Sequence, residues 1–268
     1  MRSNLYWTLK RTRALFIRAF ALSTEYRAEM LIWIVSGSLP LIMMLIWIGL
    51  AEDGPVGGYT ATDFAAYFLT VFLVRQITVV WVLWDLDREI RLGELSPKLL
   101  RPLDPYWEHV AGNLAEKTLR IPIVLLPVAL GLWLTGGRLD LSPLNLAVFV
   151  VTVAGAWTIR FNQQYSFGLL TFWFDQVLGL EQTYFALYIG LSGALIPLDL
   201  FPDAVRAVVA YTPFPYMIDF PAQVLLGKVA GADLWRGLAA QGAWVLAFAG
   251  LRLLLWRRGL KRYGAVGA

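Results

Sequence analysis

Residues 84–120 hold the longest charged stretch of this sequence, between two long apolar runs. Six lysines or arginines alternate there with seven aspartates or glutamates. Ser96-Pro97 and Asp104-Pro105 each place a capping side chain before a proline, which predicts a helix start, and Pro102 ends the first helix. Two helices separated by a proline, between membrane-length runs, are typical of a loop that docks on a partner protein. A solvated connector without a partner is the alternative.

Residue types that most enzymes use are scarce. The chain has no cysteine and one histidine, His109, so thiolate chemistry is excluded and little imidazole chemistry is left. Neither the phosphate-loop pattern G-x-x-x-x-G-K-[ST] nor the zinc pattern H-E-x-x-H occurs. Asp199 and Asp219 stand alone among prolines, and no neighbouring residue supports a catalytic pair. The sequence therefore predicts no catalytic residue, metal site or cofactor site in this chain.

Two arginines, Arg75 and Arg160, lie inside apolar runs. An arginine within a bilayer usually faces the bundle interior or a water-filled path, or pairs with an acid. Each is therefore a candidate for the transport path or for a contact between subunits. An internal hydrogen-bonded clamp is the alternative. The polar residues 162–164 favour this alternative for Arg160, whereas both readings stay open for Arg75.

The composition indicates a membrane protein. Hydrophobic residues make up 58% of the chain and charged residues only 16%, which is far from the mixture of a soluble domain. Twelve tryptophans and eleven tyrosines suit the two membrane interfaces, where amphipathic rings gather. The net charge of +4 does not indicate nucleic-acid binding, because the basic residues cluster at the boundaries of the apolar runs. No cleavable signal peptide is expected.

Apolar runs of about 20 residues predict transmembrane helices, and the expected fold is an all-α membrane protein of one domain, residues 1–268. Pro122 and Pro127 predict a kink in the third span, which is short. The fourth span is either long and tilted or polar in its middle. The six expected spans cover residues 30–50, 64–84, 121–135, 144–174, 183–198 and 234–256.

Two further segments do not fit a span. Residues 1–28 predict an amphipathic interface helix, in which Phe16 lies on the apolar face and Arg11 and Arg18 lie opposite. A surface or targeting helix is the alternative. Prolines cut residues 199–228 into pieces too short to cross a bilayer, which predicts external or re-entrant helices, one of them from Asp203 to Tyr211.

The basic residues predict the orientation. They gather in the amino-terminal segment, in residues 85–120 and at the carboxyl terminus, and the opposite loops hold few of them. The positive-inside rule therefore places both termini and residues 85–120 in the cytoplasm. Residues 85–120 are accordingly expected to be a cytosolic coupling region.

Several blocks of the sequence resemble type-2 ATP-binding-cassette (ABC) transporter permeases. The first is Ile90-Arg91-Leu92-Gly93-Glu94-Leu95 with Leu99-Leu100-Arg101-Pro102, which is similar to the cytosolic loop of these permeases. Further blocks at 171–174, 191–202, 213–216 and 258–267 follow in the expected order and resemble one bacterial subfamily. The resemblance implies an interface helix, six spans, a coupling helix between spans two and three, and a short external helical hairpin before span six.

The resemblance also implies the function. We expect the membrane-spanning subunit of an ABC exporter in the bacterial inner membrane, paired with a second permease and with a separate nucleotide-binding subunit that holds ATP and magnesium. A hydrophobic or amphiphilic substrate is expected by analogy with the family. The alternatives are a membrane-embedded lipid-modifying enzyme and an ion-coupled secondary transporter. Contacts to the ATPase subunit are expected from Glu94, Leu95, Leu99, Leu100 and Arg101.

Overall fold

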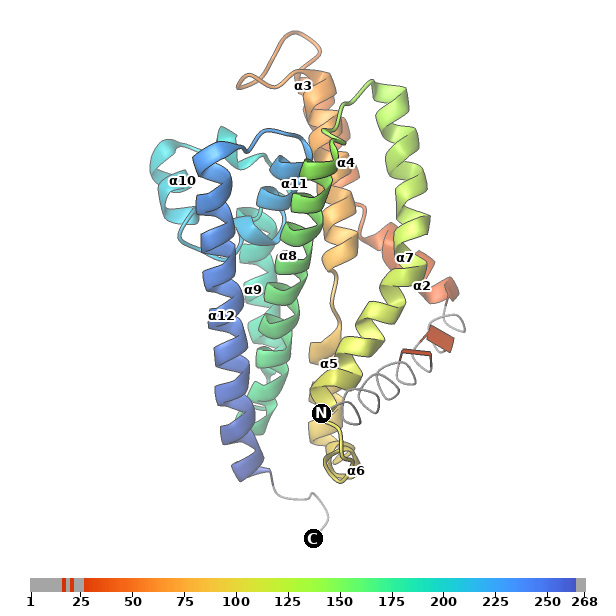
Figure 1. Cartoon of the computed structure of the whole chain (residues 1–268), viewed down its shortest axis with the longest axis vertical. Coiled ribbons are helices and arrows are strands. Elements are labelled where there is room, and N and C mark those ends of the chain that lie inside the picture. The colour runs from red at the N-terminus through yellow and green to blue at the C-terminus, as the bar shows by residue number, and fades with distance from the viewer. Residues whose placement is uncertain (1–15, 18–19, 22–26, 264–268) are drawn as a thin grey trace.

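The structure is a computed structural model that describes residues 16–17, 20–21 and 27–263. This part of the chain is built of α-helices, with one isolated β-bridge between Val56 and Tyr59 (Figure 1). Within it, five helical segments are long and apolar enough to cross a membrane. The prediction of an all-α, multi-pass membrane protein is therefore confirmed, whereas five segments satisfy the criteria where six were expected.

The first span consists of two helices. Residues 30–50 were expected to form one helix, but α2 (Arg27–Ser36) ends before Gly37 and α3 (Leu39–Leu50) begins two residues later. Together they still provide an apolar segment from Met30 to Leu50 that is long enough for a bilayer.

A side chain from another helix compensates for this break. The Nε2 of Gln76 donates a hydrogen bond to the Ile34 carbonyl at 3.1 Å, and its Oε1 accepts one from Arg120 Nη1 at 2.9 Å. A Cβ atom at Gly37 would lie only 2.8 Å from Gln76 Nε2, so glycine leaves the room that this amide occupies. The interruption is thus satisfied from inside the protein, as a bilayer requires.

The second span is interrupted as well. In place of one helix over 64–84, α4 (Ala61–Thr78) and α5 (Val82–Arg91) are separated by residues 79–81. Nearly every residue of α4 is buried, which makes it the central helix of the bundle. The amphipathic α5 continues into the charged stretch of the sequence.

The charged stretch folds into α6 (Leu95–Leu99) and the start of α7 (Pro105–Thr135). As predicted, Asp104 caps α7: its carboxylate accepts from the Tyr106 N–H at 2.9 Å. The start predicted at Ser96-Pro97 is wrong by two residues, because α6 already begins at Leu95 with Glu94 at the N-cap, and the serine side chain does not cap it.

The third span is the second half of α7. The expected segment 121–135 belongs to a helix that begins sixteen residues earlier, at Pro105, and passes through Pro122 and Pro127 without ending. Figure 1 shows that α7 bends along its length, in agreement with the predicted kink.

Helices α8 (Pro143–Leu169) and α12 (Gly231–Arg262) pack side by side over much of their length (Figure 1). A short 3₁₀ helix, η1 (Leu170–Phe172), extends α8. These elements agree with the spans expected at 144–174 and 234–256 to within a few residues at most ends. The longer discrepancy is at the end of α12, which extends past the apolar run into its basic tail.

The fifth span expected at 183–198 is not observed with these bounds. Helix α9 (Val177–Leu191) has 15 residues and is therefore only about 22 Å long, shorter than the roughly 30 Å of a bilayer core. It ends at Ser192, and Gly193 follows with a φ of +88°. The chain then turns instead of continuing as a helix.

Short helices fill residues 199–228, as expected. The predicted helix from Asp203 is present as α10, which ends at Val209. Every residue of α11 is buried, and the helix packs against α4 and α8. The elements are η2 (Leu198–Leu200), α10 (Asp203–Val209), η3 (Pro215–Met217) and α11 (Asp219–Leu225).

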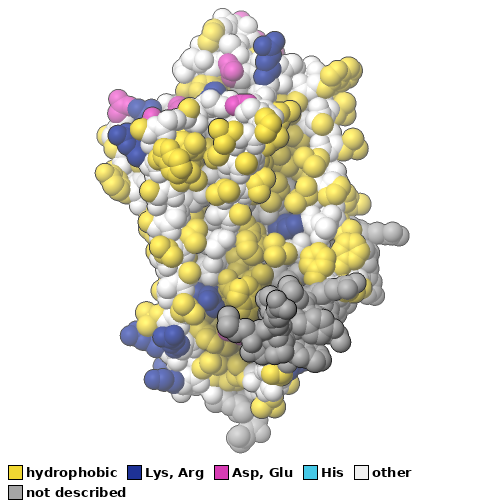
Figure 2. Space-filling view, viewed as in Figure 1, with side chains coloured by type: hydrophobic (Ala, Val, Ile, Leu, Met, Phe, Trp, Pro, Cys, Tyr) yellow, Lys and Arg dark blue, Asp and Glu magenta, His cyan; other side chains and the backbone are white. Residues whose placement is uncertain are grey.

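The visible surface follows the same division. In Figure 2 hydrophobic side chains cover the middle of the molecule, and most charged side chains gather at its two ends. Of the expected interface helix, Arg11 and Arg18 lie outside the described residues. Phe16 is helical and 36% exposed, and its ring stacks on that of Phe20.

Replacing Gln76 by leucine should destabilise the fold. The change leaves the Ile34 carbonyl without its donor and removes one acceptor of Arg120, which should cost about 1–3 kcal/mol. The measurement is the thermal unfolding midpoint of the purified chain in detergent. The exposed Gln182→Leu serves as the control and should leave the midpoint unchanged. Equal midpoints for the two variants would contradict this role of Gln76.

Candidate functional site

Helices α5 and α6 and the first turns of α7 form one end of the molecule (Figure 1). Gly93 turns the chain between α5 and α6 with a φ of +73°, a backbone conformation that favours glycine. Leu95 then packs with Leu86 and Ile90 and is wholly buried. This leucine was expected to contact a partner, and its position shows that it anchors α6 to the protein.

Ion pairs fix the orientation of α6. Lys98 lies between an acid of α5 and an acid of α7: its Nζ is 2.7 Å from Glu89 Oε1 and 3.8 Å from Glu108 Oε2. Arg101 reaches Glu108 at 3.5 Å, and His109 Nε2 lies 3.3 Å from Glu89 Oε2. Because Glu89 is only 4% exposed, its pair with Lys98 is shielded from solvent.

The outer face of α6 carries the other residues that sequence predicts for coupling. Leu100 is 89% exposed and Leu99 36% exposed. The Glu94 carboxylate lies 3.5 Å from Arg88 Nε, and the side chains of Glu94 and Arg88 are 50% and 60% exposed. Together with Arg101, they place apolar and charged groups on one small protruding surface, which can contact another protein.

This end is connected to the transmembrane helices by polar contacts of α5 and α6. The Asp87 carboxylate accepts from Arg91 at 2.9 Å and from Thr171, next to α8, at 2.7 Å. Arg91 also donates to the Asp175 carbonyl. Ser96 and Tyr263, just after α12, have their hydroxyls 3.0 Å apart. A displacement of α6 would therefore act on α5, α8 and α12.

The break between α4 and α5 is stabilised by α7. The Val79 carbonyl accepts hydrogen bonds from Lys117 Nζ and from Asn113 Nδ2, the latter at 3.5 Å. Asn113 is itself held by Trp157 Nε1, which donates to its Oδ1 at 2.7 Å. Since Lys117 is 5% exposed, this break is a buried joint between the bundle and α5.

Arg160 lies in a buried polar cluster. Its Nη2 is 3.6 Å from Glu181 Oε1 on α9, and its guanidinium lies 4.2 Å from the Tyr188 ring centroid. Gln163 and Gln164 each donate to Glu181 at 3.0 Å. These contacts are those of an internal clamp between α8 and α9.

Sequence reasoning missed Glu181, although a signal was present. A buried arginine requires a counter-charge, and Glu181 is the acid that begins the neighbouring apolar run. It lies two residues before the start of the span expected at 183–198. In the structure it belongs to α9 and is 4% exposed.

Arg75 has a weaker set of contacts. Its Nη1 donates to the Gly37 carbonyl at 3.4 Å, at the break in the first span. It is half-buried, close enough to Arg160 and Tyr188 to interact with them electrostatically. Among the described residues, Arg75 therefore lies near a second arginine but has no carboxylate within ion-pair distance.

Asp199 and Asp219 come together at the opposite end of the molecule. Tyr67 donates to Asp219 Oδ1 at 2.8 Å, and Tyr59 donates to Asp199 Oδ2 at 2.7 Å. Gln223 also donates to Asp199, at 3.1 Å. Each carboxylate is thus held by a tyrosine, an arrangement that fixes the short helices on α4. Across the part of the chain that the structure describes, no group of three or more His, Cys, Asp or Glu residues could hold a metal ion.

Burial disfavours the charged form of Asp219 and raises its pKa to about 7. The hydrogen bond from Tyr67 lowers this pKa, whereas the nearby Asp199 carboxylate raises it further. Burial likewise raises the pKa of Tyr59 and lowers that of Lys228, whose Nζ lies 3.6 Å from the centre of the Tyr59 ring.

Helices of membrane-spanning length, a central buried helix and a charged end with its own short helix define a multi-pass integral membrane protein. The sequence profile of a family described as "ABC-2 family transporter protein" matches residues 37–267. The chain therefore belongs to this family and is an ABC-2 type permease, the membrane subunit of a transporter that works with an ABC ATPase subunit. No curated protein matches the chain.

Removing the counter-charge of Arg160 should be costly. Glu181→Ala leaves a buried guanidinium unpaired and should lower the free energy of unfolding by about 3–5 kcal/mol, whereas Arg160→Met combined with Glu181→Leu should recover part of the loss. Thermal unfolding in detergent measures both effects. The exposed Arg206–Asp203 pair provides the control: Asp203→Ala should change stability by less than about 1 kcal/mol.

Asp219 should make stability dependent on pH. The pKa of Asp219 is raised in the folded state, so the folded protein holds this proton more tightly than the unfolded chain does. The resulting stabilisation of the fold is complete below the unfolded pKa of about 4 and is lost as the pH rises through about 7. Asp219→Asn imitates the protonated acid, so its unfolding midpoint should fall less than that of the wild type between pH 5 and pH 8.5. Asp53→Asn, at an exposed aspartate, should keep the wild-type slope. An unchanged slope for Asp219→Asn would show that another group titrates.

Proposed function

We propose that the chain is the transmembrane subunit of an ABC-2 exporter, which moves a hydrophobic or amphiphilic substrate out of the cytoplasm. ATP and magnesium would be bound by a separate nucleotide-binding subunit, and a second permease, identical or related, would complete the transporter. Family membership supports the class of transporter. The observation that carries the rest is the exposed α6 surface, whose leucines and charges are held in place by Lys98 and Leu95.

The proposed orientation puts α6 and both termini in the cytoplasm of a bacterial cell, with the chain in its inner membrane. The distribution of basic residues supports it. In this orientation the interface helix expected over residues 1–28, with Arg11, Phe16 and Arg18, would lie at the inner leaflet and brace the ATPase subunit.

In the proposed mechanism the ATPase subunit moves α6 when it closes on ATP. Leu99 and Leu100 would fill an apolar groove on that subunit, and Glu94 and Arg101 would set the register. Leu95 would transmit the movement, because it joins α6 to the core formed by α5 and α8.

The buried joint at residues 79–81 is the place where α5 could turn relative to α4. Such a two-state element is what a transporter needs to alternate between inward and outward states. Its Val79 carbonyl is held by side chains of α7 and not by a helical N–H, so α5 can tilt without breaking a helix.

The transport path is proposed at the interface between two permeases. Arg75 is the candidate residue, because it is half-buried and lacks a carboxylate partner in the described chain. Arg160 is the weaker candidate, since Glu181 already compensates its charge.

The test is co-purification with nucleotide-binding subunits encoded in the same organism. Leu99→Asp combined with Leu100→Asp should reduce ATPase capture by roughly tenfold or more, because charged side chains replace the apolar contact at the centre of the interface. Leu141→Asp combined with Leu144→Asp is the matched control. These leucines are 63% and 77% exposed, lie three residues apart at the other end of the molecule, and should leave capture intact.

The outcomes separate the alternatives. If the wild type captures no ATPase, an enzyme or an ion-coupled carrier becomes the better explanation. If both double variants capture it equally, the transporter assignment stands and the docking surface lies elsewhere. Gel filtration of each variant shows whether it is folded.

A further inference from the structure

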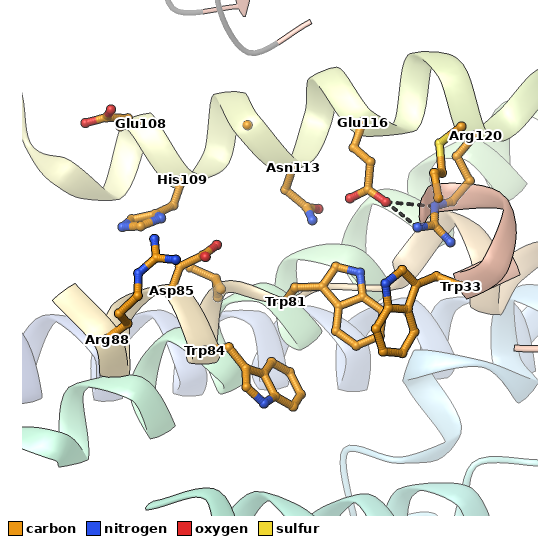
Figure 3. A pocket seen from close by; sticks show the side chains of 13 residues that line it. Trp33, Trp81, Trp84, Asp85, Arg88, Glu108, His109, Asn113, Glu116 and Arg120 are labelled. Atoms are coloured by element: carbon orange, nitrogen blue, oxygen red, sulfur yellow. Dashed lines mark hydrogen bonds and ion pairs between the residues drawn. The ribbon is translucent and has the colours of Figure 1, made fainter. Parts of the chain in front are cut away.

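A cavity of about 1000 Å³ lies between α2, α5 and α7 (Figure 3). It is separate from the exposed leucines of α6 and from the cluster around Arg160, although Trp81 and Asn113 of its lining also belong to the joint between α4 and α5. Tryptophans line one part of it and charged side chains another.

The apolar wall is aromatic. The ring centroids of Trp33 and Trp81 are 4.8 Å apart, and those of Trp81 and Trp84 are 5.5 Å apart. Trp33 and Trp84 remain 44% and 43% exposed, so they present indole surface to the cavity. Indole faces carry a partial negative charge and attract cations, tryptophan more strongly than any other aromatic side chain.

The polar wall has an excess of acid. Three carboxylates line the cavity, from Asp85, Glu108 and Glu116, against the guanidiniums of Arg88 and Arg120. Arg120 is committed to Glu116 and Gln76. Arg88, which lies beside Asp85 in Figure 3, forms its ion pair with Glu94. Asp85 itself is exposed and has no hydrogen bond or ion pair with any described residue.

His109 lines the cavity from α7, and its side chain is 7% exposed. Its Nε2 lies 3.3 Å from Glu89 Oε2, a carboxylate that Lys98 also contacts. In Figure 3 the His109 ring lies close to Asp85 and Arg88. Because the imidazole is already held by Glu89, Asp85 is the lining carboxylate that is left for a ligand.

We propose that this cavity binds the ammonium headgroup of a membrane amphiphile. The Asp85 carboxylate pairs with the ammonium group, and the indoles of Trp81 and its neighbours cover its alkyl part. The tail lies on exposed apolar side chains of the helices that form the cavity, among them Ile32 of α2 and Leu114 of α7, which are 68% and 43% exposed. An anion is disfavoured, because the free charge of the lining is a carboxylate and both guanidiniums are paired.

This inference depends on neither the ATPase subunit nor transport, so it can fail or succeed independently of the proposed function. Its test uses the full chain, purified in detergent and supplied with equal amounts of phosphatidylethanolamine and phosphatidylglycerol. After washing, the lipid that stays bound is quantified by mass spectrometry. The wild type should retain phosphatidylethanolamine in preference to phosphatidylglycerol.

Two variants of the site should lose this preference. Asp85→Asn and Trp81→Leu should each lower phosphatidylethanolamine retention by about tenfold, the loss expected for a charge-assisted contact, and should leave phosphatidylglycerol retention unchanged. The matched controls are Asp53→Asn and Trp133→Leu, at an exposed aspartate and at a tryptophan that is 77% exposed. Both should retain lipid as the wild type does. Asp85→Glu, which keeps the charge, should retain phosphatidylethanolamine as the wild type does, and this result would show that the lost charge and not a folding defect explains Asp85→Asn.

A second probe separates the ammonium from the phosphate of the lipid. Dodecyltrimethylammonium, which has no phosphate, should displace phosphatidylethanolamine from the wild type. Equal retention of the two lipids would overturn the proposal. A loss of retention in Arg88→Gln without a loss in Asp85→Asn would indicate an anion site and would overturn it as well. Identical retention by all variants would also overturn it, because the lipid would then be bound only to the outer apolar surface.

Discussion

The bilayer offers no water to satisfy backbone groups, and the architecture of this permease depends on that constraint. Two of its spans are interrupted, and in both cases a polar side chain from a neighbouring helix bonds to the freed carbonyl. Gln76 does so for Ile34 and Lys117 for Val79. The two side chains come from α4 and α7, so the breaks also tie the first three spans together. Interruptions that would be costly in an isolated helix thereby become specific joints.

Buried charge obeys the same rule. Arg120 is 1% exposed and bonds to both Glu116 and Gln76, and Arg160 is opposed by Glu181. A buried pair of this kind contributes little net stability, but loss of one partner is expensive. The pairs therefore select one packing of the helices. Arg75, with a single carbonyl acceptor, stands apart from this pattern.

The two ends of the molecule are organised differently. On the α6 side, Lys98 and Leu95 hold a short helix so that its leucines face outward, and adjacent to it lies a cavity of tryptophans and acids. On the other side, tyrosines bind the aspartates of the short helices and fix them against α4. One end is thus suited to contacts with other molecules, and the other is a closed arrangement of hydrogen bonds around two carboxylates.

The sequence alone determined the membrane class, the helical fold, the start of α7 at Asp104-Pro105 and the family resemblance, because composition, apolar run length and capping patterns are local properties. It did not determine that the spans break at Gly37 and at residues 79–81, that α9 is too short to cross as expected, or that Glu181 faces Arg160. These features depend on which polar side chain of another helix lies opposite a given backbone or charge. Leu95 and Leu100 show the same limit: both are leucines in one short helix region, and only packing buries the first and exposes the second.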